Sequence, residues 1–315
     1  MHKAVALSFA SIVMTTAAIT SCGNSNDNVQ IATGQVAVGN AGDSNLVYSH
    51  ARALEAKGNT KKAIRAYAKV ADDYPMSKEA PSSRIRQAEL LYAQGESIKS
   101  FEKYQSFITQ YRGTSQYTEA IQRQSDIAHA ASNGQIKNSF LGLKSDIPRS
   151  KVEKMFIQVR DNAPFGPTAP KAQFALAEMW QNDKNLGKAI KGYEELYVRY
   201  PKSSLAPEAL FRVGNLLLKQ TEDGNRNRGN LDTANTTFTD LTLLYPNTKQ
   251  AKSAKSILQQ IKGSDVQRSF GIAEFYEKKK QYPSAAFYYN EVIRTTKSGS
   301  ELNLSAKQRL AALPK

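Results

Sequence analysis

GNTKKAIRAYAKVADDYP (58–75) shares one pattern with two later stretches, GESIKSFEKYQSFITQYR (95–112) and KNLGKAIKGYEELYVRYP (184–201). Each stretch has a small residue, an aromatic residue four positions later and an apolar residue three positions beyond that. This spacing places the three side chains on one face of an α-helix. Each stretch ends in Tyr-Pro or Tyr-Arg, and proline cannot continue a helix. The pattern therefore predicts a recurring amphipathic helix that stops at a turn.

Five copies of this pattern and one degenerate copy, which begins with Val152, are present. Their first residues, the anchors, are Ala63, Ser100, Val152, Ala189, Ala234 and Ala285. Most anchors follow an earlier small residue at Ala51, Ala88, Ala177, Gly214 or Ala273. The arrangement resembles the two-helix unit of the tetratricopeptide repeat. SELNLSAKQRLAAL (300–313) predicts a closing helix, since a terminal repeat must cover its apolar face. We therefore expect an all-α, tetratricopeptide-repeat-like α-solenoid of about six helical hairpins plus a C-terminal capping helix. An unrelated helical bundle is the alternative.

The anchors are unevenly spaced, so the longer steps between them require insertions. Polar or glycine-bearing segments at 133–148, 222–230 and 261–269 predict loops at these places. The alternating pattern that indicates β-strands is absent from the sequence.

The N-terminus is typical of an exported protein. A short basic tip precedes a mostly apolar run that is too short for a membrane-spanning helix, so residues 1–21 are expected to be a cleaved signal peptide. Ile19-Thr20-Ser21-Cys22 resembles the bacterial lipobox, which implies that Cys22 carries acyl chains such as palmitate. Two or more such chains anchor a protein stably to a membrane. The alternative is an incidental or buried cysteine.

The residues after the lipobox predict where the protein lies. Gly23 stands where an Asp would be an inner-membrane retention signal, so the resemblance implies the outer membrane of a Gram-negative-type bacterium, facing the periplasm. Residues 22–44 are then the lipidated cysteine and a flexible tether rich in Gly, Asn and Ser.

The formal net charge of +15 restricts the partners. A basic surface attracts nucleic acid, anionic lipid headgroups or acidic proteins. Because an exported protein rarely meets nucleic acid, we expect lipid headgroups and acidic partners and no nucleic acid. A solvated basic surface that only keeps the protein soluble is equally compatible with this charge.

No motif for catalysis, for a metal or for a cofactor stands out. His50 and His129 are the only histidines after the signal peptide, and neither has the HExxH context of a zinc site. Phosphate-binding loops and nucleophile elbows are absent from the sequence. Glu96 beside Ser97 is compatible with the acid of a peptidoglycan-cleaving transglycosylase, but its expected place in a turn favours a helix N-terminus. We expect a protein that is not an enzyme.

The second half of the chain resembles a known family. The resemblance runs from about residue 149 to 297 and includes the turn Pro164-Phe165-Gly166-Pro167. LDTANTTFTDLTLLYPNTKQAKSAKSIL (231–258) and FGIAEFYEKKKQYPSAAFYYNEVIR (270–294) continue it. These stretches are similar to the BamD family of outer-membrane lipoproteins. The resemblance implies a periplasmic scaffold of the BAM machinery, which binds a POTRA-bearing barrel protein and helps to fold outer-membrane proteins.

The resemblance also suggests a division of the chain. Residues 133–315 correspond to BamD-like repeats with the capping helix, and residues 45–132 add tetratricopeptide-like repeats that members of the family lack. The expected partners are a POTRA-containing barrel assembly protein, accessory lipoproteins and unfolded outer-membrane protein segments. The alternative is a tetratricopeptide lipoprotein that coordinates peptidoglycan and cell-envelope processes, or that pilots a secretin or pilus system.

Two groups of residues are candidates for binding a partner. Large apolar residues lie three positions before the small residues of the first helices, which predicts a row along the inner curve: Tyr48, Ile85, Phe174, Phe211 and Phe270. The second group is a basic turn with a tyrosine: Lys278, Lys279, Lys280 and Tyr282. The alternatives are packing against the next hairpin for the first group and simple solvation for the lysines.

Overall fold

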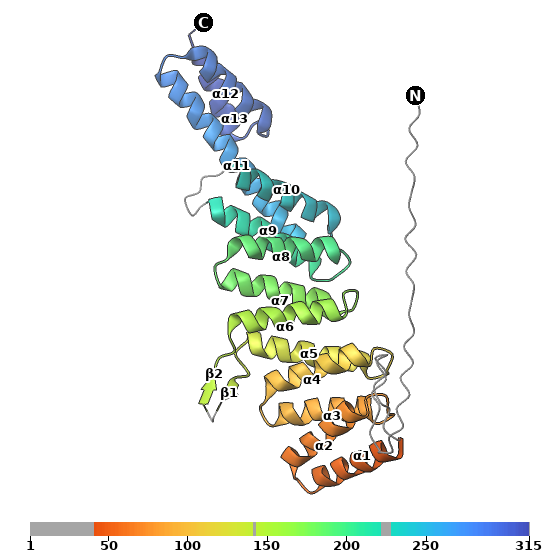
Figure 1. The fold of residues 1–315 in the computed structure, drawn as a ribbon. Coiled ribbons are helices and arrows are strands. Elements are labelled where there is room, and N and C mark those ends of the chain that lie inside the picture. The colour runs from red at the N-terminus through yellow and green to blue at the C-terminus, as the bar shows by residue number, and fades with distance from the viewer. Residues whose placement is uncertain (1–40, 141–142, 222–227, 315) are drawn as a thin grey trace, which may run out of the picture.

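The computed structural model describes residues 41–140, 143–221 and 228–314. The expected signal peptide, Cys22 and all but the last residues of the expected tether lie outside this part of the chain. The described residues form thirteen α-helices, which stack into an elongated solenoid (Figure 1). None of these helices is both long and apolar enough to cross a bilayer.

Twelve of the helices pair into six hairpins, and the last covers the C-terminal end. The hairpins are α1 (Ala41–Ala56) with α2 (Thr60–Asp73), α3 (Ala80–Ala93) with α4 (Ser97–Gln110), α5 (Tyr117–Ser132) with α6 (Arg149–Asn162), α7 (Thr168–Asn182) with α8 (Leu186–Arg199), α9 (Ala206–Gln220) with α10 (Arg228–Leu244) and α11 (Lys249–Lys278) with α12 (Tyr282–Thr295). The capping helix is α13 (Glu301–Ala312). The expected solenoid of six hairpins and a capping helix is confirmed.

The recurring pattern forms the core. Every anchor, every aromatic residue four positions later and every apolar residue three positions beyond that is at most 3% exposed. The aromatic positions are Tyr67, Tyr104, Phe156, Tyr193, Phe238 and Tyr289. Apolar clusters follow one another along the solenoid, from α1 to α13. Each hairpin therefore buries its apolar face against its neighbours, as in other repeat proteins.

In five of the hairpins, the turn between the two helices has one residue with a left-handed backbone. These residues are Gly58, Gly95, Gly134, Lys184 and Lys280, with φ between 58° and 77°. Glycine adopts this conformation without strain, whereas a side chain loses about 1–2 kcal/mol there. The two lysine turns are therefore less favourable than the three glycine turns.

Hydrogen bonds between the two helices of a hairpin recur as well. In three hairpins the buried tyrosine donates its hydroxyl hydrogen to a side chain twelve residues earlier: Tyr67 to Glu55 at 2.7 Å, Tyr193 to Gln181 at 3.1 Å and Tyr289 to Glu277 at 2.5 Å. An arginine from the following helix pair or cap then contacts the acid. Arg86 pairs with Glu55, and Arg309 lies 3.4 Å from Glu277. These contacts connect successive units of the stack.

The predicted loops differ in part from the structure. Residues 261–269 lie inside α11, a continuous helix of 30 residues, so the prediction of a loop there was wrong. This helix packs against the fifth hairpin with its first half and against α12 with its second, so its exposed middle needs few apolar residues. The segment 133–148 contains a short antiparallel pair, β1 (Asn138–Phe140) and β2 (Leu143–Ser145), although no alternating pattern predicted strands. Of the remaining predicted loop, 222–230, residues 222–227 lie outside the described residues, and residues 228–230 begin α10, so the prediction of a loop was wrong for these three.

Candidate protein-docking groove

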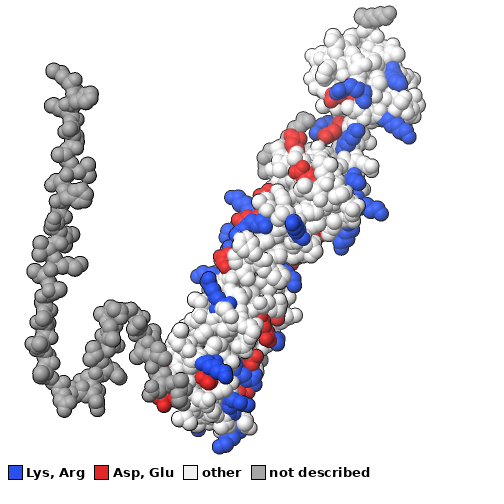
Figure 2. All heavy atoms as spheres, turned by 90° about the vertical axis from the view of Figure 1, so that its right-hand side faces the viewer, with Lys and Arg blue, Asp and Glu red and all other residues white. Residues whose placement is uncertain are grey.

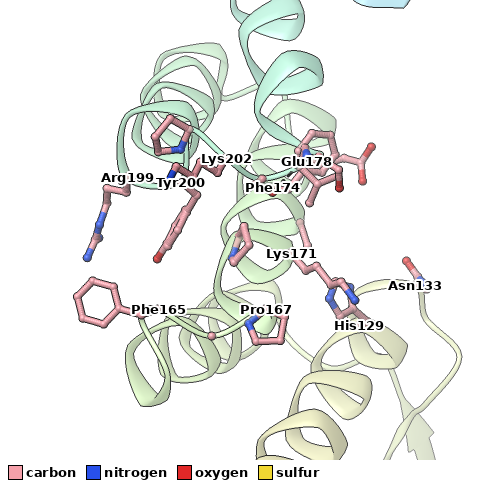
Figure 3. Close-up of a pocket in the computed structure, with 17 residues that line it drawn as sticks. His129, Asn133, Phe165, Pro167, Lys171, Phe174, Glu178, Arg199, Tyr200 and Lys202 are labelled. Atoms are coloured by element: carbon pink, nitrogen blue, oxygen red, sulfur yellow. Dashed lines mark hydrogen bonds between the residues drawn. The ribbon is translucent and has the colours of Figure 1, made fainter. Parts of the chain in front are cut away.

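A groove of about 1030 Å³ crosses the middle of the solenoid (Figure 3). It lies between the end of α5, the turn that joins α6 to α7, the exposed side of α7 and the turn that joins α8 to α9. Its lining is His129, Asn133, Phe165, Gly166, Pro167, Pro170, Lys171, Phe174, Ala175, Glu178 and the segment 199–205. We call this the central groove. It is formed by three hairpins together, so it exists only when they are stacked.

The turn Pro164-Phe165-Gly166-Pro167 forms one wall of the central groove. Gly166 N donates to the carbonyl oxygen of Ala163 over 2.9 Å, which closes the turn. A Cβ at position 166 would lie 3.1 Å from the Ala163 Cβ and 3.2 Å from its carbonyl oxygen, so the turn has little room for a larger residue. The tight turn projects the Phe165 side chain away from the core, where it is fully exposed. An exposed phenylalanine held by a rigid turn is a suitable anchor for a partner.

The opposite wall is the turn that joins α8 to α9. Tyr200 N donates to Leu196 O over 2.8 Å, Ser203 N to Tyr200 O over 2.9 Å and Ala206 N to Ser203 O over 3.0 Å. The same chain of hydrogen bonds occurs between other hairpins, so this turn follows from the repeat. Figure 3 shows Arg199 and Tyr200 pointing from this turn toward Phe165.

The rim of the central groove is mainly basic. Lys171, Arg199 and Lys202 are exposed, and none of them forms an ion pair within the described part of the chain. The one acid of the lining, Glu178, lies 3.9 Å from Arg212. An apolar floor with a basic rim suits a peptide that carries both apolar and acidic side chains.

His129 at the edge of the central groove has a packing role. Its ring meets the ring of Phe156 edge-on, with 5.1 Å between the centroids. Burial lowers the pKa of His129 because it removes water from the charged form. The imidazole is therefore neutral at neutral pH, and it adds no charge to the groove.

The predicted row of large apolar residues is only partly accessible. Four of its members are half-buried and meet the buried aromatic residue of their own hairpin edge-on: Tyr48, Phe174, Phe211 and Phe270, with centroids 5.3–5.9 Å apart. Ile85 is 8% exposed and belongs to the core. Phe174 reaches the central groove, and Tyr48 with Ile85 lines a second groove of about 750 Å³ at the N-terminal end. The row thus contributes to two grooves, and its role in binding stays a prediction.

The basic turn lies at the far end of the solenoid from α1 (Figure 1). Lys278, Lys279 and Lys280 are exposed, and Tyr282 begins α12. The Lys279 Nζ lies 5.8 Å from the centre of the Phe275 ring. This turn is separate from the central groove.

Several residues of the central groove were not among the sequence-based candidates, namely Lys171, Arg199, Tyr200 and Lys202. Helical periodicity reports which residues face the core, and it does not report which turns of neighbouring hairpins meet. The Tyr-Pro pair at 200–201 marked a turn, but not its position opposite Phe165.

The residues considered for catalysis have other surroundings. Glu96 is the residue before the first turn of α4, and its carboxylate pairs with Lys99 three positions later. Within the described ranges no group of three or more His, Cys, Asp and Glu side chains is placed to hold a metal ion.

Comparisons with known proteins give two matches to families. Residues 149–310, just over half of the chain, match the YfiO family, described as an outer membrane lipoprotein. Residues 48–113, which cover most of the first two hairpins, match a tetratricopeptide repeat family. No curated protein matches the chain.

Solved structures of low sequence identity are also similar. MamA from Desulfovibrio magneticus RS-1 is 14% identical, over 68% of this chain and 99% of that one, with a TM-score of 0.31. A tetratricopeptide repeat protein from Parabacteroides merdae is 12% identical, over 87% and 98%, with a TM-score of 0.32. The pilF protein of Pseudomonas aeruginosa is 11% identical, over 86% and 100%, with a TM-score of 0.30.

Proposed function

Because the chain belongs to the YfiO family of outer membrane lipoproteins, we propose that it is a scaffold in the assembly of outer-membrane proteins. Proteins of this family and of the tetratricopeptide repeat class are generally not enzymes but bind other proteins. The scaffold is anchored to the outer membrane through acyl chains on Cys22 and faces the periplasm. Its partners are a POTRA-bearing barrel protein, accessory lipoproteins and unfolded outer-membrane protein segments.

The observation that carries this proposal is the central groove with Phe165 at its mouth. Moving a fully exposed phenylalanine side chain out of water contributes about 1.5–3 kcal/mol, which is typical of an anchoring residue in an interface. The ring is held by a tight turn between two packed helices, so little conformational entropy is lost when a partner covers it. The basic rim adds attraction for acidic groups beside the apolar segment.

The N-terminal hairpins supply a further docking surface in this proposal. Residues 45–132 form the additional repeats, and residues 133–315 form the YfiO-like part. The second groove carries charges of both signs, Arg52 and Arg86 with Glu55 and Glu89, beside Tyr48. A groove of this composition differs from the central groove, so the two grooves serve different partners.

A photo-crosslinker placed at position 165 tests the proposal. In intact cells it is expected to capture a POTRA-bearing barrel protein or an unfolded outer-membrane protein. The matched control is a crosslinker at Leu244, an exposed apolar residue of α10 outside the groove. Capture of a cell-wall synthase or a secretin at position 165 would instead support the alternative role in peptidoglycan or secretin piloting.

A further inference from the structure

Four aromatic rings form a continuous chain on the last hairpin. Neighbouring ring centres are 5.6 Å apart between Phe275 and Tyr276, 5.8 Å between Tyr276 and Tyr288, and 5.3 Å between Tyr288 and Phe287. The two tyrosines are half-buried, whereas Phe275 is 55% exposed and Phe287 is 65% exposed. The chain of rings therefore ends in a phenylalanine in water on either side.

Packing within the solenoid does not explain Phe287. It lies two positions after the anchor of its hairpin, and this position is exposed in all six hairpins. The other five hairpins have polar residues there, namely Arg65, Glu102, Lys154, Lys191 and Thr236. A large apolar side chain at a position that the repeat leaves in water indicates a contact outside the chain.

The exposure of Phe275 follows from the length of α11. The matching residues of three earlier hairpins, Leu90, Met179 and Leu216, are at most 8% exposed. The long helix α11 places α12 away from the fifth hairpin (Figure 1). The preceding hairpin therefore does not cover Phe275.

Unpaired positive charge borders the rings. Lys278, Lys279 and Lys280 begin three positions after Phe275 and form no ion pair among the described residues, and Lys279 lies over the Phe275 ring. The two acids that precede these lysines in α11, Glu274 and Glu277, form their contacts on the side of α13. Glu277 accepts the Tyr289 hydroxyl and contacts Arg309, and Glu274 lies 3.2 Å from Arg309. Figure 2 shows this end of the molecule as mostly uncharged, with Lys and Arg and some acidic atoms among the uncharged residues.

We propose that the aromatic–lysine surface, formed by Phe275, Tyr276, Phe287, Tyr288 and Lys278–Lys280, binds the surface of an anionic phospholipid membrane. Aromatic side chains are enriched at the membrane–water interface, and each lysine near an anionic surface adds attraction. A bilayer needs exposed rings and no groove, and the rings line neither the central nor the second groove. The net charge of +15 favours the same partner over long range.

This inference does not depend on the central groove, and it adds a second membrane contact to the proposed anchor. The aromatic–lysine surface and α1 lie at opposite ends of the solenoid (Figure 1). With the proposed anchor at the α1 end and lipid contact at α12, the solenoid lies along the bilayer.

Vesicle flotation with residues 23–315 tests the inference without an acyl chain. Every described contact lies within residues 41–314, so this chain keeps the whole fold. It is expected to float with vesicles of phosphatidylglycerol and phosphatidylcholine and to bind vesicles of phosphatidylcholine alone much more weakly. Phe275→Ser with Phe287→Ser is expected to lower binding about tenfold or more. Each Lys→Gln change at positions 278 to 280 is expected to lower it about fivefold at low salt.

The control is Leu243→Ser with Leu244→Ser, since these α10 side chains are 71% and 61% exposed and lie outside the surface. Binding by the control variant should equal that of the unchanged chain, and both double variants should keep its melting temperature. Equal loss in the two double variants, or equal binding to the two kinds of vesicle, would overturn the inference. So would intact vesicle binding by the Phe275→Ser, Phe287→Ser variant together with loss of an acidic protein partner. None of these results bears on crosslinking at position 165, so the two proposals can fail separately.

Discussion

Gly214→Ala should destabilise the protein, although alanine is the better helix former. Gly214 lies in α9, and a Cβ there would lie 2.6 Å from both Cε1 and Cζ of Phe238 in α10. Ordinary contacts between carbon atoms are about 3.5–4.0 Å, so the two helices must separate by about 1 Å. The Phe238 ring is fully buried and cannot turn away.

The size of this effect follows from two opposing contributions. Forcing an extra methyl group into a packed interface costs about 1–3 kcal/mol. Replacing glycine by alanine inside a helix stabilises the folded state by about 1 kcal/mol. We therefore expect a net loss of up to about 2 kcal/mol in the free energy of unfolding.

Gly263→Ala is the matched control. Gly263 lies inside α11, and no atom lies within 4 Å of a Cβ built there. This change should raise the free energy of unfolding by about 0.5–1 kcal/mol, which also tests whether the segment predicted as a loop is helical. Urea unfolding followed by circular dichroism measures both variants. With a slope of about 1–3 kcal/mol per M, their midpoints should differ by about 1 M. Equal midpoints would refute the close packing of α9 on α10.

Further predictions concern turns, ionisation and catalysis. Lys280→Gly should raise the free energy of unfolding by about 1 kcal/mol, and with it the melting temperature, because it removes a lysine with a left-handed backbone. Gly95→Ala, its counterpart in the second hairpin, should lower the melting temperature. A lower melting temperature for Lys280→Gly would contradict the turn geometry. Burial raises the pKa of Tyr104 to about 12 from 10.0, so its neutral form stabilises the fold up to about pH 10 and this stability is lost as the pH rises toward 12. Tyr104→Phe should reduce the fall in the urea midpoint between about pH 9 and about pH 11, and an unchanged fall would contradict this assignment. The purified chain should not cleave peptidoglycan, so an activity that disappears in Glu96→Gln would overturn the non-catalytic scaffold.

The fold could be predicted because the repeat encodes it locally. A small residue, an aromatic four positions later and an apolar residue three beyond that report one buried helix face, and all six copies are buried as expected. The family resemblance from about residue 149 could also be recognised in the sequence, because the Pro-Phe-Gly-Pro turn is specific. The family match covers residues 149–310.

Features that depend on neighbouring hairpins were harder to predict. The segment 261–269 has the polar composition of a loop, yet it is helical because hairpins on both sides hold α11 together. Arg199 and Lys202 come to line the same groove as Phe165 only when neighbouring hairpins have stacked. The unusual exposure of Phe287 could have been predicted from the sequence, since comparison of the six copies shows one aromatic residue at an otherwise polar position.

The most direct test of the docking account is co-purification from outer membranes with the unchanged protein and with Phe165→Ser. Phe165 is fully exposed, so the substitution should leave the melting temperature unchanged. The account predicts that the unchanged protein retains a POTRA-bearing barrel protein and that Phe165→Ser loses about tenfold or more of it, since burial of the ring contributes about 1.5–3 kcal/mol. Equal recovery of the barrel protein by both chains would contradict it.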